Sequence, residues 1–232
     1  LEHYGSEVNG LTQSITQFLG IISLLELGVG QVIQSALYRP LATKDQYTLN
    51  CVLASGNKFF KRIAYMLLAY VVVLTAIFPF AVAKEFDWIY TATLIGAIGI
   101  GSFAQYYFGI IDRILLNADQ RGYIQYVSQI ITLVINTALC AIFILAGFSV
   151  QFVKLTASLV FLLRPFVVRL YVNKHYSIDR NVVYEDEPVK QKWNGIAQHI
   201  SAFVLNGTDN IVLTLFSTLS NVSIYSVYHL VV

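Results

Sequence analysis

Two basic residues lie inside a long apolar stretch of this sequence, where charged side chains are rare. Arg164 is in the middle of the run 150–172, next to Pro165, and Lys154 is near the start of that run. A central Arg or Lys costs about 2.5–3.5 kcal/mol when a helix is inserted into a bilayer. Proline removes a backbone donor and can kink a helix. A kinked helix that turns Arg164 inward would place a basic side chain where it can contact an anion. Lys154 either contacts the same anion or extends its side chain to the membrane surface.

Ionisable residues in other apolar segments are candidates for ion coupling. Glu26 and Asp209 lie inside two such segments. Each can act as a counter-ion to Arg164, as a proton or Na⁺ site, or as a contact between packed helices, because charges in a bilayer pair with one another or mark ion pathways. Asp112 and Arg113 come at the end of an apolar run. We predict that these two residues pair at the membrane boundary.

Polar residues also recur at helical spacing in four segments. At 100° per residue each set falls near one face of a helix. The sets are Thr12, Thr16, Ser23, Glu26 and Gly30; Ser102, Gln105, Gly109 and Asp112; Gln125, Gln129, Thr132 and Asn136; and His199, Asn206, Asn210 and Ser217, with Asp209 beside the last set. A single polar face fits a tight helix interface, since such side chains hydrogen-bond across helices. Four polar faces favour a shared, water-filled cavity.

Patterns for the common catalytic chemistries are missing from the sequence. There is no G-x-x-x-x-G-K-[ST] phosphate loop, and the four histidines form no H-x-x-x-H pair. Cys51 and Cys140 lack metal-ligand spacing. The sequence therefore predicts no enzyme, no cofactor and no metal, and the net charge of +2 is interpreted as an effect of topology, not as a sign of a nucleic-acid partner.

The elements that position these residues are membrane-spanning helices. Hydrophobic residues make up 56% of the chain and charged residues 12%, and the mean hydropathy is +0.64. Soluble domains carry about 25% charged residues, and about 20 apolar residues cross a bilayer as a helix. We predict an all-α, polytopic transmembrane bundle. Its spans are expected at 10–34, 63–83, 88–111, 123–147, 150–172 and 196–217, and a seventh starts near Leu219.

The distribution of basic residues predicts the orientation. Twelve of the 15 Lys and Arg residues fall in or beside the loops at 39–62, 112–122 and 173–195, and only Lys84 falls in an opposite loop. Cytoplasmic loops are enriched in Lys and Arg, so the first set is expected in the cytoplasm and residue 1 outside. We expect a first bundle over 1–172, a solvated linker over 173–195 and the start of a second bundle over 196–232. The chain is interpreted as a fragment that lacks one or more N-terminal spans and everything after the seventh.

Several short motifs resemble those of polysaccharide and oligosaccharide flippases. They occur in the order and at the spacing of that family along nearly the whole chain. The motifs are 24–30 (LLELGVG), 37–42 (LYRPLA), 116–123 (LNADQRGY), 206–213 (NGTDNIVL) and 222–228 (VSIYSVY). The family belongs to the superfamily that also includes multidrug exporters and flippases of peptidoglycan precursors.

The resemblance implies two six-helix bundles around a cavity, with the first helix and most of the second bundle absent from these residues. It implies transport of undecaprenyl-diphosphate-linked glycans from the cytoplasmic to the outer leaflet of the bacterial plasma membrane, driven by ion gradients. The implied partners are membrane lipid, the lipid-linked glycan, a polysaccharide polymerase and glycosyltransferases. In this interpretation Arg164 and then Lys154 contact the diphosphate. The sugar ligands would be Gln125, Gln129, Asn136 and Asn206, and the ion-coupling residues Glu26 and Asp209.

Two other functions remain open from the residues. A cation-coupled exporter of small drug-like molecules would have acidic residues dominating its cavity. A membrane assembly subunit that transports nothing would use its polar faces as dry helix contacts. These alternatives differ in whether a cavity exists and in which charges line it.

Overall fold

The computed structural model describes residues 4–22, 28–82, 86–180, 182–184, 186–189, 208–209 and 211–229. Within these ranges the secondary structure is helical, and no strand occurs. The elements are α1 (Gly5–Gly20), α2 (Val29–Thr43), α3 (Gln46–Ala81), α4 (Trp88–Ala104), the π-helical turn η2 (Gln105–Gly109), α5 (Ile110–Ala118), α6 (Tyr123–Leu145), α7 (Val150–His175) and α9 (Leu219–His229). The predicted all-α class is confirmed.

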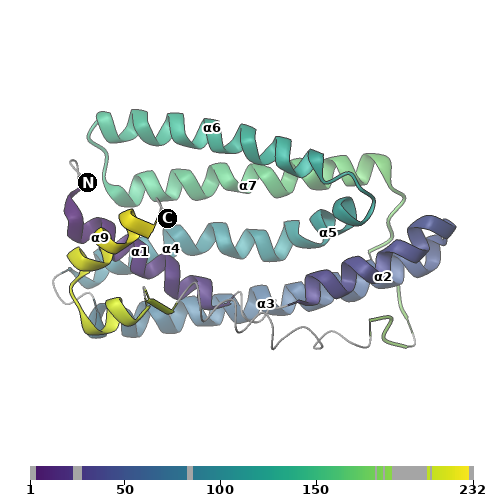
Figure 1. Cartoon of the computed structure of the whole chain (residues 1–232), viewed down its shortest axis with the longest axis horizontal. Helices are drawn as coiled ribbons and strands as arrows, with labels where there is room; N and C mark the ends of the chain where they lie inside the picture. The colour runs from purple at the N-terminus through teal and green to yellow at the C-terminus, as the bar shows by residue number, and fades with distance from the viewer. Residues whose placement is uncertain are drawn as a thin grey trace.

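Within the residues that the structure describes, four helices are long and apolar enough to cross a membrane. They are Gln46–Ala81, the continuous run Trp88–Ala118 that joins α4, η2 and α5, Tyr123–Leu145, and Val150–His175. They overlap the spans predicted at 63–83, 88–111, 123–147 and 150–172, although the first begins at Gln46 and the second continues to Ala118. In Figure 1 they lie side by side along the long axis, in the spatial order α6, α7, α4 with α5, and α3. By length and composition, these helices are typical of a membrane protein.

The span predicted at 10–34 differs in the structure. Its described residues form two helices, since α1 ends at Gly20 and α2 begins at Val29. Gly28 precedes α2 with φ 71°, a left-handed conformation that a helix interior does not accept and that glycine adopts without strain. Residues 23–27, which include Glu26, lie outside the described residues, as do most of the span predicted at 196–217 and Asn206 within it.

The region before the second span is part of the same helix. Asp45 caps α3, because one oxygen accepts from the Thr48 amide at 3.1 Å and the other from the Thr48 hydroxyl at 2.6 Å. These hydrogen bonds lower the pKa of Asp45 below its usual value. From this cap α3 continues to Ala81. Its first turns are buried against α2 and α5.

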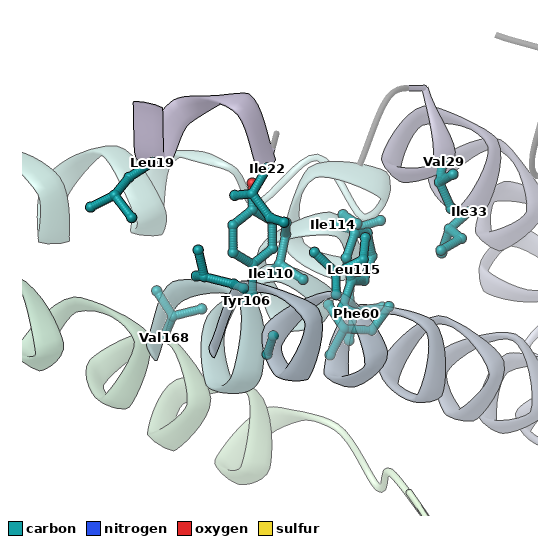
Figure 2. Packing of buried hydrophobic residues seen from close by; sticks show 14 of the residues in the cluster. Leu19, Ile22, Val29, Ile33, Phe60, Tyr106, Ile110, Ile114, Leu115 and Val168 are labelled. Atoms are coloured by element: carbon teal, nitrogen blue, oxygen red, sulfur yellow. The ribbon is translucent and has the colours of Figure 1, made fainter. Parts of the chain in front are cut away.

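Apolar packing holds α2, α3, α5 and α7 together. Figure 2 shows Phe60 of α3 against Ile114 and Leu115 of α5, and all three side chains are less than 5% exposed. Large apolar side chains on the outer faces of α3, α6 and α7 are exposed, as expected for surfaces that face lipid.

The two ends of the bundle differ in charge. At one end Gln46 at the start of α3 donates to the Ser177 carbonyl at 2.6 Å, just beyond α7. At the same end Tyr176 donates to Asp119 after α5. The loops with the basic residues therefore gather here, at what we call the basic end. At the other end Tyr4 donates to the Phe148 carbonyl at 2.6 Å, between α6 and α7.

Part of the predicted linker packs against the bundle. Ser55 of α3, which is 1% exposed, donates a hydrogen bond to Glu187, and Val189 is 4% exposed. These residues lie beside α2, near Val32 and Ala36. Val189 differs from the predicted solvated linker, because apolar Val189 and Pro188 in an otherwise charged segment cover an apolar surface beside α2.

Candidate functional site

A cavity of about 400 Å³ lies among α1, α4, η2, α5, α6 and α7. Three basic side chains line it: Arg113 from α5, and Lys154 and Arg164 from α7. Its polar lining also includes Thr16, Ser102, Gln105, Gln125 and Ser158, and no Asp or Glu is among its lining residues. The cavity therefore carries basic and polar side chains on a lining that is otherwise mostly apolar.

One face of α7 forms the longest wall of the cavity. Lys154, Ser158, Phe161, Arg164 and Val168 recur at intervals of three or four residues, which places them on a single helical face. Ser158 donates to the Ala97 carbonyl of α4 at 2.5 Å and so joins this wall to the next. Lys154 and Arg164 therefore both line the cavity, because they lie on this face of α7.

Pro165 meets the π-turn at close range on the same wall. A Cβ placed on Gly109 would lie 2.7 Å from the Pro165 Cβ, which is shorter than real contacts allow. Glycine at this position therefore permits η2 to approach α7. The π-turn inserts an extra residue into the helix, and both Gln105 at its start and Gly109 at its end line the cavity.

The cations are spread along the cavity. Arg113 is close enough to Arg164 for their positive charges to repel. Lys154 lies toward the other end, beside Cys140 of α6. No ion pair joins Arg164 or Lys154 to a carboxylate among the described residues. A cation in a partly dry space is costly, and an anion beside Arg164 or Lys154 would relieve that cost.

Gln125 adds an unused acceptor. Its side chain is 7% exposed, and its Oε1 atom has no hydrogen-bond partner among the described residues. Buried polar atoms nearly always have a partner. Because Gln125 lines the cavity, a ligand with hydroxyl groups could supply the missing donor.

Other predicted site residues lie elsewhere. Gln129 is exposed, and Asn136 accepts a hydrogen bond from the Cys140 thiol at 3.5 Å. Asp209 is exposed and accepts from the Tyr225 hydroxyl at 2.6 Å. None of these three is among the cavity's lining residues. Of the predicted α6 residues, Gln125 lines the cavity and Gln129 and Asn136 do not. The reason is that α6 packs mainly on α7, so only a narrow face of α6 is covered.

Arg113 is the cavity residue that the sequence interpretation missed. The predicted pair of Asp112 with Arg113 is not the arrangement found, because Asp112 pairs with Arg180 at 2.9 Å. The spacing of the sequence could have predicted Arg113 at the cavity. Gln105, Gly109 and Arg113 are four residues apart, and residues at this spacing share a helix face.

Comparisons with protein-family models, curated proteins and solved structures find no match to this chain. Function must therefore be inferred from the cavity. No group of three or more His, Cys, Asp and Glu side chains suited to a metal occurs in the part of the chain that the structure describes. The arrangement can hold an anion between basic side chains and accept hydrogen bonds from a neighbouring polar group.

Proposed function

We propose that this chain is part of a flippase that moves undecaprenyl-diphosphate-linked oligosaccharide or polysaccharide repeat units from the cytoplasmic to the outer leaflet of a bacterial plasma membrane. The observation that supports this most is the cavity lined by Arg113, Lys154 and Arg164 within a membrane helix bundle. The motif resemblance to flippases supports the same function.

The physical need for such a cavity follows from the substrate. A diphosphate and its sugars must cross about 30 Å of hydrocarbon. Arg164 and Arg113 offer charge and paired N–H donors for phosphate oxygens, and Gln125 offers an acceptor for a sugar hydroxyl. The prenyl chain can stay in lipid while only the headgroup enters.

The volume limits which part of the substrate these helices hold. Ligand sites usually occupy about 300–1,000 Å³, and this cavity, at about 400 Å³, is at the small end. It has room for a diphosphate and an adjoining sugar. The remaining sugars would need further walls, which the resemblance assigns to a second bundle.

The charge of the cavity also bears on the alternatives. A cation-coupled exporter of cationic drugs needs acidic groups near its substrate, and the cavity's lining residues in the described part of the chain include none. An assembly subunit needs no cavity, so a basic hollow among its helices would have no role. The cationic lining thus favours an anionic substrate over both.

Replacing Arg164 tests the proposal. Arg164→Ala should lower glycan export by roughly ten- to a hundredfold, because a hydrogen bond to a charged group contributes about 1.5–3 kcal/mol. The measurement is surface polysaccharide in a deletion strain that expresses each variant at equal protein level. Arg164→Lys keeps the charge and should retain part of the export.

Lys174→Ala is the matched control, because Lys174 is a basic residue on the same helix that is exposed and does not line the cavity. It should export at the wild-type rate. Unchanged export by Arg164→Ala would remove this residue from the mechanism. Increased drug susceptibility of the deletion strain with normal surface glycan would favour the exporter instead.

A further inference from the structure

The outward face of α3 changes abruptly from cationic to apolar. Lys58, Lys61, Arg62 and Tyr65 lie within an arc of about 100° at 100° per residue. Lys58 and Arg62 are exposed, and Tyr65 is 57% exposed. Exposed apolar side chains follow on the same half of the helix: Leu68, Val72, Val73, Ile77 and Phe80. A cationic turn midway along α3 therefore leads directly into a lipid-facing stripe.

An aromatic ring from the π-turn holds the cationic turn in place. The Lys61 ammonium lies over the Tyr107 ring, 5.2 Å from its centroid. The Tyr65 ring meets Tyr107 edge-on at 6.0 Å, and Phe103 stacks on Tyr107 at 5.4 Å. Cation–π contact restricts the Lys61 side chain, while its N–H groups remain able to donate to a ligand. Lysines of an ordinary lipid-facing helix end lack this constraint.

We propose that Lys61, Arg62, Tyr65 and Tyr107 form a binding site for the headgroup of an anionic phospholipid in the leaflet at the basic end. The phosphate would accept from Lys61 and Arg62, and the acyl chains would lie along the apolar stripe of α3. Tyr side chains favour the depth of the headgroups, and basic pockets at the cytoplasmic surface attract anionic lipids. The apolar stripe excludes free phosphate as the preferred ligand, because only a lipid also covers that stripe.

The site also shares an element with the cavity. Tyr107 belongs to η2, and Gln105 and Gly109 of the same five-residue turn line the cavity on the other side. A lipid that orders Tyr107 therefore contacts the element that shapes the cavity wall. This binding site goes beyond the proposed transport function and does not depend on it.

Fluorescence quenching by brominated lipids tests the site directly. Replacing the two native tryptophans, Trp88→Phe and Trp193→Phe, gives a dark background. Tyr65→Trp then places a reporter at the site of the full-length protein, reconstituted in phosphatidylcholine vesicles. Brominated phosphatidylglycerol should quench this reporter with an association constant at least fivefold above that of brominated phosphatidylcholine. A matched reporter, Tyr126→Trp, is also exposed and lies in the first turn of α6. It should show a smaller preference.

Two further variants separate a site from general surface charge. Lys61→Ala should lower the preference for phosphatidylglycerol over phosphatidylcholine, as reported by the tryptophan at residue 65, by about fivefold. One basic residue near an anionic surface contributes about that factor. Tyr107→Leu should lower it as well, whereas Tyr107→Phe keeps the ring and should keep the preference. Arg39→Ala removes an exposed charge from α2 and should leave the lipid preference unchanged. Equal quenching by the two lipids, or equal losses for Lys61→Ala and Arg39→Ala, would overturn the site. Transport assays play no part in this test.

Discussion

Ion pairs at the basic end differ widely in how much they contribute to the stability of the fold. Asp112 is 1% exposed, and one of its oxygens pairs with Arg180 at 2.9 Å. Arg180 also donates to the Asn173 side chain at 3.1 Å, so it ties the segment after α7 back to α5. By contrast the pair of Arg121 and Asp119, at 3.1 Å, is solvent-exposed. Breaking a buried pair leaves a charge without compensation, whereas water compensates an exposed one.

Arg180→Ala should therefore destabilise the protein by about 3–5 kcal/mol, the typical cost of removing one partner of a buried pair. Thermal unfolding of the purified protein in detergent measures this. The double variant Asp112→Asn with Arg180→Ala should recover much of the loss, because no buried charge is left. Arg121→Ala, the exposed control, should have a far smaller effect. Equal losses for Arg180→Ala and Arg121→Ala would contradict this account.

The same end shows a titratable contact outside the membrane spans. Tyr176, just beyond α7, donates to Asp119, and the guanidinium of Arg121 lies 5.7 Å from the centre of its ring. Burial, and then the hydrogen bond to Asp119, raise the pKa of Tyr176 above its usual value. Tyr176 therefore stays protonated as a donor throughout the physiological range.

Among the elements, the π-turn has the largest influence on the cavity. It presents Gln105 to the cavity and Tyr107 to Lys61, and it approaches α7 closely where Gly109 meets Pro165. A regular helix would present these side chains at a different angle, since the π-turn adds one residue to the repeat. The proposed transport and lipid sites therefore both depend on this short element.

Gly109→Ala should destabilise the protein by about 1–3 kcal/mol, the usual cost of overpacking a filled site. Its added Cβ would lie 2.7 Å from the Pro165 Cβ. Gly96→Ala on α4 is the matched control, because a Cβ there meets nothing within 4 Å. That variant should be neutral or more stable by about 0.5–1 kcal/mol, since Ala is favoured over Gly within helices. Unfolding in detergent compares the two, and an equal response would show that η2 and α7 are not in close contact.

At the scale of the whole molecule, residues 200 positions apart in the chain meet at the end opposite the basic end. Figure 1 shows α1 beside α9 there. Ser14 and Thr214 hydrogen-bond at 2.8 Å, and Asn9 donates to Ser223 at 2.8 Å. A Cβ on Gly10 would lie 1.8 Å from the Leu219 carbonyl oxygen. The predicted first bundle and the start of the predicted second bundle are thus in direct contact through small and polar residues.

Cysteine cross-linking checks this contact. With Cys51 and Cys140 replaced by serine, Ser14→Cys and Thr214→Cys should form a disulfide on mild oxidation, because their hydroxyl oxygens lie 2.8 Å apart. Ser14→Cys with Leu215→Cys is the control, since Leu215 is 54% exposed. Gly10→Ala should reduce the cross-link, and Gly20→Ala, where a Cβ meets nothing within 4 Å, should not. Comparable yields from both cysteine pairs would argue against the contact.

The sequence by itself determined the class of the protein and the positions of four spanning helices. Hydropathy and charge are local properties, and a backbone in lipid must satisfy its own hydrogen bonds as a helix or a closed barrel. Barrel strands are about ten residues long and alternate in hydrophobicity, so long continuous apolar runs indicate helices. It also predicted Arg164, Lys154 and Gln125 as side chains of a polar cavity, since periodicity puts polar residues on one face. The structure brings these three to one cavity.

Only the tertiary structure decided which partners those faces meet. Arg113 joins the cavity while Asp112 turns to Arg180, because the segment beyond α7 folds back onto α5. Gln129 is left exposed because, among the described residues, α6 packs mainly on α7. The break at Gly28 and the π-turn at Gln105–Gly109 depend on packing between helices. A periodic pattern predicts which residues share a helix face. The surface that packs against that face comes from segments far away in the chain, which the pattern does not identify.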